Sequence, residues 1–351
     1  MNPSAASGPP ASRSLLVAPQ WIGDAVMAQP LVQRLAARGE RVHALALPAV
    51  APVLRAMPGI EQVLEMPFAH GRLDLRARLR IAQGLRGEGF ARAYVLGNNV
   101  KARLVPWLAR IPERIGWRGE AAGWLLTQAL QPSPTATRQD MRLHYALLAG
   151  DCDIAALEQP RLQVAQRQAR ASADHHGLRQ PFIALCPGAE YGPAKQWPAE
   201  QYTALAALAQ TAGWRVALLG SPRERTMATA IAGALPAGAA PVSDLCGRTS
   251  MQQAIELLAA ADGVVSNDSG LMHIAAALGR PTVGIYGSTD PRHTPPAAHR
   301  SRALWLHLPC SPCFARDCPL GHRNCLRALD ASWAWQTLRE LMQAAMPRDA
   351  A

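Results

Sequence analysis

The feature that most constrains the fold is an alternation of short apolar runs with helix-like stretches, interrupted once near the middle of the chain. The runs that indicate strands are Ser14–Ala18, Arg41–Leu47, Gln62–Met66 and Ala93–Leu96, and later Pro181–Cys186, Arg215–Leu219, Gly263–Ser266 and Thr282–Tyr286. Helical patterns occur near Ala25–Ala37, Val100–Ala109, Ala199–Thr211, Glu224–Ala234, Met251–Ala260 and Leu271–Leu278. Such alternation is typical of βαβ units and parallel sheets.

The interruption, a polar and Pro-containing stretch around residues 150–163, predicts two domains. A length of 351 residues also suits two cores of ordinary size. We therefore expect an α/β protein of two doubly wound parallel-sheet lobes, over residues 14–160 and 161–330. We expect a disordered tail over residues 1–13 before them and a C-terminal helix within residues 331–351 after them. This helix could pack back on the N-terminal lobe. Ligands of open parallel sheets bind beyond the carboxyl ends of the strands, so both lobes are expected to face one cleft.

Composition indicates the compartment. The chain has no run of 18 apolar residues and no charged start followed by an apolar stretch. Its seven cysteines are an odd number in a long chain, which does not suggest a secreted disulfide framework. We expect a cytoplasmic protein.

The positive charge is concentrated in the first part of the chain. Residues 1–150 carry 18 Arg and Lys against 9 Asp and Glu, and the remaining residues carry 18 against 16. A basic lobe indicates an anionic partner, which could be nucleic acid, an acidic membrane surface or a phosphorylated substrate. Only Lys101 and Lys195 are lysines, so a lysine is unusual enough here to suggest a chemical role.

A candidate anion site lies where an apolar run ends in Ser266-Asn267-Asp268-Ser269-Gly270 and turns into a helix. Such a turn leaves several backbone N–H groups unpaired at the positive end of the helix dipole. Asp268 and His273 would flank the bound anion. A core histidine remains the alternative for His273, because a short helix behind a strand is normally buried.

Three further loops follow predicted strands. Asp24 begins the first helix and is either an N-cap or a general base. Lys195 ends a glycine-punctuated loop that begins at Pro187, and it is either solvated or a ligand of the anion. Glu224, after Gly220, could hold a pair of ribose hydroxyls.

Two other clusters have less specific meanings. Arginines crowd one segment, which can be a solvated helix face or an anion-binding surface; they are Arg72, Arg76, Arg78, Arg80 and Arg86. Cysteines are spaced as Cys310-x2-Cys313-x4-Cys318-x6-Cys325 in a Pro-containing loop with His322. This spacing allows a zinc site or a tightly packed reduced loop, because only one C-x2-C pair is present.

Taken together, these motifs resemble the ADP-heptose:lipopolysaccharide heptosyltransferases of glycosyltransferase family nine, from about Ser14 to Trp335. The motifs are Ile22-Gly23-Asp24, Pro187-Gly188-Ala189 through Lys195-x-Trp197-Pro198, Gly220-x3-Glu224 and the run from Ser266 to His273. Glu190-Tyr191-Gly192-Pro193 and the cysteine segment are more similar to the second enzyme of that pathway than to the first.

The resemblance implies a GT-B fold, an inverting transfer of heptose from ADP-heptose, and neither a cofactor nor a metal for the chemistry. Asp24 matches the general base and Lys195 the ligand of the diphosphate. The other implied donor-binding residues are Gly23, Gly188, Glu190, Tyr191, Glu224 for the ribose, Thr249 near the adenine, Asp268, Ser269, Gly270 and His273.

The implied acceptor is heptosyl-Kdo2-lipid A, which would be reached by transient contact with the cytoplasmic face of the inner membrane. We expect Arg72, Arg76, Arg78 and Arg80 to bind it. The alternatives are the first heptosyltransferase, another GT-B enzyme such as a nucleotide-sugar epimerase and, more remotely, a nucleic-acid-binding protein. No nucleic-acid-binding motif is recognisable, and no G-x-G-x-x-G follows the first strand, which disfavours a nicotinamide dehydrogenase.

Overall fold

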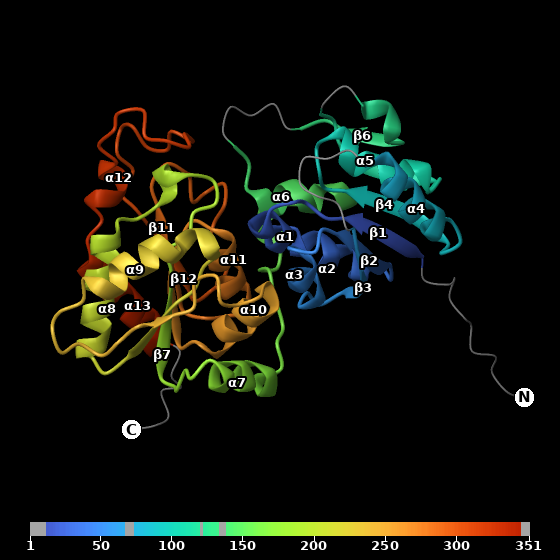
Figure 1. Cartoon of the computed structure of the whole chain (residues 1–351). Helices are drawn as coiled ribbons and strands as arrows, with labels where there is room; N and C mark the ends of the chain where they lie inside the picture. The colour runs from blue at the N-terminus through green and yellow to red at the C-terminus, as the bar shows by residue number, and fades with distance from the viewer. Residues whose placement is uncertain (1–11, 67–73, 120–121, 133–137, 345–351) are drawn as a thin grey trace, which may run out of the picture. The chain divides into compact units, whose positions relative to one another are not determined.

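The chain divides into two compact units. The computed structural model describes residues 12–66, 74–119, 122–132 and 138–344. One unit comprises residues 1–20, 28–137 and 142–157, and the other comprises residues 21–27, 138–141 and 158–351 (Figure 1). Of the tail expected over residues 1–13, residues 1–11 lie outside the described part, and the first strand begins at Arg13.

The first unit is built on a six-stranded parallel sheet in the order β3-β2-β1-β4-β5-β6. Its strands are β1 (Arg13–Val17), β2 (Arg41–Ala46), β3 (Ile60–Glu65), β4 (Phe90–Val95), β5 (Glu113–Trp117) and β6 (Gln128–Leu130). Its main helices are α2 (Gln29–Ala37), α3 (Ala51–Arg55), α4 (Leu75–Arg86), α5 (Val100–Leu108) and α6 (Met141–Ala146). The strand order reverses between β1 and β4, as in a doubly wound fold.

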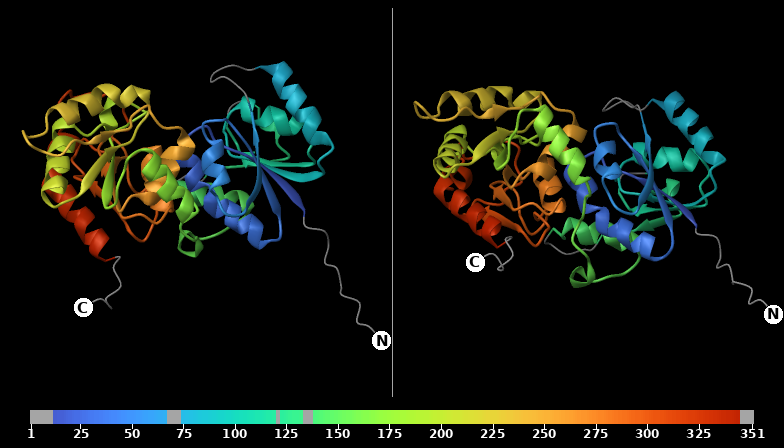
Figure 2. Two further views of the ribbon diagram at one scale, coloured as in Figure 1. Left: turned by 60° about the horizontal axis from the view of Figure 1, so that its bottom comes forward. Right: turned by 90° about the horizontal axis from the view of Figure 1, so that it is seen from below.

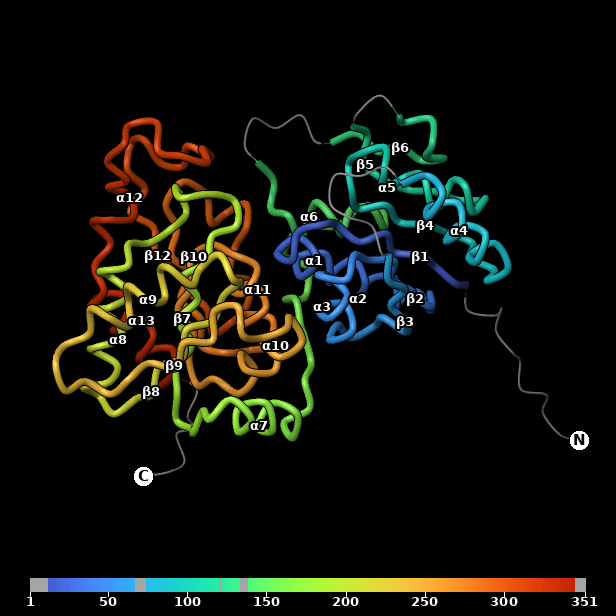
Figure 3. The backbone as a smooth tube through the Cα atoms, viewed as in Figure 1, coloured from blue at the N-terminus to red at the C-terminus, as the bar shows by residue number. Residues whose placement is uncertain are grey.

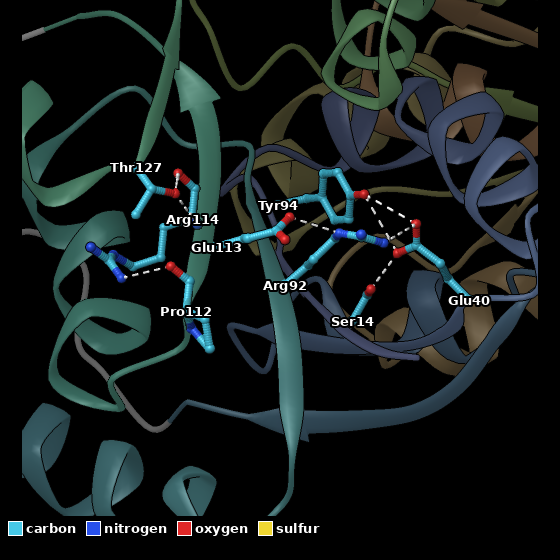
Figure 4. Close-up of polar contacts among 8 residues, drawn as sticks. All are labelled: Ser14, Glu40, Arg92, Tyr94, Pro112, Glu113, Arg114 and Thr127. Carbon is cyan, nitrogen blue, oxygen red and sulfur yellow. Dashed lines mark hydrogen bonds and ion pairs between the residues drawn. The ribbon is translucent and has the colours of Figure 1, made fainter. Parts of the chain in front are cut away.

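A buried polar cluster ties the strands of this unit together (Figure 4). The carboxylate of Glu40, which is 8% exposed, accepts hydrogen bonds from the hydroxyls of Ser14 on β1 and Tyr94 on β4. Arg92, also on β4, pairs with Glu40 and donates to Glu113 on β5 at 2.8 Å. Because Glu40 is paired with Arg92 and accepts hydrogen bonds from both hydroxyls, its carboxylate can be buried without remaining an isolated charge, while Arg92 and Glu113 are partly exposed.

The second unit repeats the pattern with the strand order β12-β11-β10-β7-β8-β9, again all parallel. Its strands are β7 (Phe182–Cys186), β8 (Arg215–Leu218), β9 (Ser243–Asp244), β10 (Gly263–Asn267), β11 (Thr282–Tyr286) and β12 (Ser301–Trp305). Its helices are α1 (Ile22–Met27), α7 (Gln166–His175), α8 (Ala199–Thr211), α9 (Arg225–Gly233), α10 (Met251–Ala260), α11 (Gly270–Ala277), α12 (Asn324–Arg327) and α13 (Ala331–Gln343).

Helices cover both faces of this second sheet (Figure 2). Side chains of α8, α9, α12 and α13 share one apolar core with β7, β8, β10 and β11. On the other face α10 packs against α7 and α11, and α11 packs against β10 and β11. The apolar face of α13 is thus buried on its own sheet through residues such as Leu338.

The two doubly wound sheets confirm the predicted fold class, but some elements differ from the sequence prediction. The helix expected over Ala25–Ala37 is two helices, because Pro30 in the first turn of α2 lacks an N–H and fits only a new helix start. The elements that were not predicted are β5, β6, β9, β12, α3, α6, α7 and α12. Among the missed strands, β6 and β9 are short and β12 is buried at a single position.

Candidate active site

The candidate site lies at the carboxyl ends of β7 and β10, where the strand order of the second sheet reverses. This reversal is the usual ligand position in an open parallel sheet. The loop after β7 carries Gly188 to Lys195, and Asp268 follows β10 directly. Neighbouring parallel strands end at one edge, so residues far apart in sequence meet there.

Asp268 is the centre of the site. Its Oδ2 accepts hydrogen bonds from Lys195 Nζ and from the Thr289 hydroxyl, both at 2.6 Å. Its Oδ1 lies 3.7 Å from His273 Nε2, one turn along α11. The Lys195 side chain is 16% exposed, against 4% for each of Asp268 and His273, so the lysine is the outward end of the cluster.

Asp24 joins this cluster because α1 packs closely against α11. A methyl group on Gly23 would lie 2.8 Å from His273 Cδ2, and one on Gly270 would lie 2.8 Å from Ile22 Cβ. Only glycine permits this approach of the two helices. The packing also explains why Trp21–Met27 group with the second unit rather than with the strand that precedes them.

The pKa values of the two carboxylates of the site are shifted in opposite directions. The pKa of Asp24 is raised to about 6, mainly by burial. The charge of Asp268 also raises this pKa, whereas His273 and Lys195 lower it. Burial alone would also raise the pKa of Asp268, but the contacts with His273 and Lys195 outweigh it and hold that pKa well below its usual range. Asp268 is therefore a fixed anion, whereas Asp24 can exchange a proton near neutral pH.

Glu224 lies next to the same loop. Its carboxylate accepts the Ser221 N–H at 2.7 Å in a capping box, and the residue is 7% exposed. A Cβ on Gly188 would lie 3.2 Å from the Glu224 carboxyl carbon, and one on Gly220 would lie 3.1 Å from its Cβ. The structure thus brings Gly188 and Glu224 together and gives Glu224 a capping role.

Asn267 is a site residue whose role the sequence reasoning missed. Its side chain is fully buried and bonds four partners: Oδ1 accepts from the Trp197 N–H at 3.1 Å and the Tyr202 hydroxyl at 3.0 Å, and Nδ2 donates to the carbonyls of Pro187 and Gly188. The loop that carries Lys195 is therefore pinned at both ends to β10. Thr289 was also missed, because it follows β11 without a motif around it.

The remaining predicted donor-binding residues surround this centre. Ser269 is the N-cap of α11, its hydroxyl lies 3.0 Å from that of Ser266, and Gly270 begins the helix. Tyr191 donates its hydroxyl to the Phe314 carbonyl at 2.8 Å, and its ring lies 5.3 Å from Lys195 Nζ. Glu190 points to Arg223, with which it forms an ion pair. Thr249 is half-buried just before α10.

The arginines predicted to bind an acceptor are not equivalent. Arg76 and Arg80 are exposed on α4, whereas Arg78 is 5% exposed and donates to the Lys101 carbonyl at 2.6 Å. Arg78 therefore ties α4 to α5 instead of facing solvent, because its position on the helix points into the unit. Arg72 lies outside the described residues.

The four clustered cysteines are free thiols. Cys310, Cys313 and Cys318 lie in the loop between β12 and α12, and Cys325 lies in α12. In Figure 3 this loop is the red segment beside α12. Cys310, Cys313 and Cys318 lie near enough to Cys325 to add to the effect of burial, and all raise its pKa. Among the described residues no group of three or more His, Cys, Asp or Glu side chains is arranged to hold a metal ion.

Comparison with known proteins decides the family. Residues 78–323 match the profile of glycosyltransferase family 9 (heptosyltransferase). The chain belongs to glycosyltransferase family 9. The chain is also 38% identical to lipopolysaccharide heptosyltransferase 2 of Escherichia coli over 305 residues, 83% of this chain and 87% of that protein. A Haemophilus influenzae lipooligosaccharide heptosyltransferase 2 is 34% identical over 83% of this chain and 88% of its own length.

Solved structures of this glycosyltransferase family share the fold. ADP-heptose lipopolysaccharide heptosyltransferase II of Escherichia coli superimposes with a TM-score of 0.83 at 33% identity, over 95% of this chain and 99% of that one. A family 9 glycosyltransferase from Veillonella parvula gives a TM-score of 0.80 at 16% identity, over 95% and 98% of the two chains. The GT-B assignment is thereby confirmed. Of the helices that the structure describes, none has the length and apolar character to cross a bilayer.

Proposed function

We propose that this glycosyltransferase moves L-glycero-D-manno-heptose from ADP-heptose to the first heptose of the lipopolysaccharide inner core and releases ADP. The observation that carries the proposal is the convergence of Asp24, Lys195, Asp268 and His273 at the switch point of one sheet. The similarity to enzymes named heptosyltransferase 2, over more than four fifths of the chain, supports the choice of the second transfer.

Lys195 is suited to bind the donor's diphosphate. An ammonium group has three donors, and Asp268 takes one of them, which fixes the lysine while leaving two for phosphate oxygens. The start of α11 at Ser269 and Gly270 adds backbone N–H groups at the positive end of a helix. Both would stabilise the charge that develops as ADP leaves.

Asp24 is suited to act as the general base. Its pKa of about 6 leaves it ionised at neutral pH and basic enough to accept the proton of an acceptor hydroxyl. In the proposed step that hydroxyl attacks the anomeric carbon of the heptose as the bond to ADP breaks. Asp24 takes the proton, ADP leaves with the electron pair, and the anomeric configuration inverts.

The other donor contacts follow from the placement of the loops. Glu224 lies next to Gly188, and its carboxylate accepts one hydrogen bond from the Ser221 N–H. Its remaining acceptor sites are proposed to accept hydrogen bonds from the ribose hydroxyls. Thr249 is proposed to lie near the adenine. Asp268 is proposed to order the donor by fixing Lys195, and His273 by its contact with Asp268.

On the acceptor side, the basic first unit is proposed to meet the phosphorylated, Kdo-bearing inner core at the cytoplasmic face of the inner membrane. Arg76 and Arg80 are exposed and available for this role. Arg78 is not proposed for this role, because its buried guanidinium donates a hydrogen bond to the Lys101 carbonyl. Arginine is well suited to phosphate because its planar donors can bind two oxygens at once.

The test is to incubate the purified enzyme with ADP-heptose and either mono-heptosylated or non-heptosylated Kdo2-lipid A, and to measure ADP release with mass analysis of the lipid. We expect turnover and a mass gain of one heptose with the mono-heptosylated acceptor. Turnover only with the non-heptosylated acceptor would show a first heptosyltransferase, and no turnover with either would contradict the proposal.

A further inference from the structure

The cysteine-rich segment contacts the active site through its backbone, at the residues between Cys313 and Cys318. We name residues 314–316 the strap. The Phe314 N–H donates to the Ser288 carbonyl at 2.7 Å, and the Phe314 carbonyl accepts the Tyr191 hydroxyl at 2.8 Å. The Arg316 carbonyl accepts the Ala194 N–H at 3.0 Å. The strap is thus bonded to the loop after β11 and to the loop after β7.

These two loops supply the two hydrogen bonds received by one oxygen of Asp268. Lys195, next to Ala194, and Thr289, next to Ser288, each donate to Asp268 Oδ2 at 2.6 Å. The backbone of the strap is hydrogen-bonded to Ala194 and Ser288, the chain neighbours of these two residues. The strap therefore connects the two side chains that donate to the same oxygen of Asp268. A shift of the strap would change the position of Lys195 relative to Asp268.

The strap is itself held firmly. Ser311, which is 5% exposed, donates to the Gly287 carbonyl at 2.6 Å and accepts from Trp305 Nε1 at 2.9 Å. The Arg138 guanidinium lies 3.9 Å from the centre of the Phe314 ring. Phe314 has φ 54°, a conformation that a bulky residue keeps only where its surroundings fix it.

The fit between strap and loop leaves no room for a side chain. A methyl group on Gly192 would lie 2.6 Å from the Arg316 carbonyl oxygen, well inside van der Waals contact. The Tyr191 ring, anchored at its hydroxyl, faces Lys195 Nζ at 5.3 Å, a distance at which a cation is attracted to an aromatic face.

We propose that Tyr191 and the strap are positioning elements for the diphosphate site, which act on the donor through Lys195. This inference rests on the proposed function and deepens it, because it gives the cysteine-rich segment a task in donor binding. It predicts that the contribution of the Tyr191 hydroxyl is lost when Lys195 is absent.

The test is a double-mutant cycle of Tyr191→Phe and Lys195→Ala, read as kcat/KM for ADP-heptose and as the dissociation constant of ADP. In the otherwise unchanged enzyme we expect Tyr191→Phe to weaken both by about fivefold, the size of one lost hydrogen bond. In the Lys195→Ala enzyme the same change should alter them by less than about twofold, because coupled residues are not additive. Gly192→Ala, which forces the strap away, should show the same dependence on Lys195.

Tyr94→Phe is the matched control, because it removes a tyrosine hydroxyl bonded to Glu40 in the first unit. It should leave the donor constants unchanged. Equal effects of Tyr191→Phe with and without Lys195 would overturn the inference, as would no effect in the enzyme that retains Lys195. If the unaltered enzyme shows no turnover with either mono-heptosylated or non-heptosylated Kdo2-lipid A, that result would instead contradict the proposed function.

Discussion

At the scale of single residues, the site separates two buried carboxylates by their surroundings. Asp268 is ionised because Lys195 and His273 compensate its burial, and it serves as an anchor. Burial raises the pKa of Asp24 to about 6, a value that suits a base working near neutral pH. Environments that separate the pKa values of two carboxylates mark different roles in other enzymes as well.

The pH dependence follows from the state in which Asp24 can act. A base must be deprotonated, so kcat/KM for the ADP-heptose reaction should be constant above a pH of about 6 and fall about tenfold per unit below it. Lys195 lowers the pKa of Asp24, so Lys195→Met should move this acid limb to higher pH. Initial rates from pH 4.5 to 8.5 measure the acid limb of the unchanged enzyme and that of the Lys195→Met enzyme. An acid limb of the variant that stays in place or moves to lower pH would contradict the assigned coupling between Lys195 and Asp24.

Sequence reasoning could name residues that the structure places together because each comes after a predicted strand. Asp24, Lys195, Asp268 and His273 were all named from motifs at strand ends, and the structure brings them together. It could not find Thr289, because nothing in Ser288-Thr289-Asp290 distinguishes it from an ordinary loop. Nor could it separate Arg78 from Arg76 and Arg80, since their difference depends on which side of α4 faces the unit.

At the scale of elements, the close packing of α1 on α11 sets the position of Asp24. Gly270→Ala would place a methyl group 2.8 Å from Ile22 Cβ, so the helices must separate and carry Asp24 away from Asp268. We expect kcat to fall about tenfold or more, since small displacements at a reacting centre are costly. Steady-state kinetics measure this.

Gly233→Ala is the matched control for that substitution. Gly233 ends α9, and a Cβ there would meet no atom within 4 Å. Its replacement should leave kcat unchanged and raise stability by up to about 1 kcal/mol, the difference in helix propensity. A Gly270→Ala enzyme as active as the Gly233→Ala enzyme would show that the close helix approach is not needed.

Most of the strands that sequence patterns predicted have continuous burial, although β3 at the edge of its sheet does not. β1, β7, β10 and β11 are buried along nearly their whole length, as an apolar run implies. Among the missed strands, β6, β9 and β12 carry weaker patterns because they lie at the edges of their sheets, where fewer side chains are buried. The contact between α1 and α11 depends on tertiary packing, which no local pattern encodes.

At the scale of the whole molecule, the charge is divided between the two halves of the chain, and the excess lies in residues 1–150. If the acceptor's phosphates bind there, replacing Arg76 and Arg80 on α4 by Gln should raise the acceptor KM at least about fivefold and leave the donor KM unchanged. The same double replacement at Arg167 and Arg170, which are exposed on α7 of the second unit, is the control. Equal effects on the donor and acceptor constants would remove the acceptor assignment.

The proposed heptose transfer depends most on Asp24 as its base, and one variant tests this role directly. Asn has nearly the shape of Asp but cannot accept the proton, so Asp24→Asn should lower kcat for ADP release by about 10²- to 10⁴-fold. Its affinity for ADP, measured by calorimetry on the same preparation, should stay within about threefold of the unchanged enzyme, because Lys195 and not Asp24 is the proposed ligand of the diphosphate. An Asp24→Asn enzyme that turns over ADP-heptose within about tenfold of the unchanged rate would contradict the account.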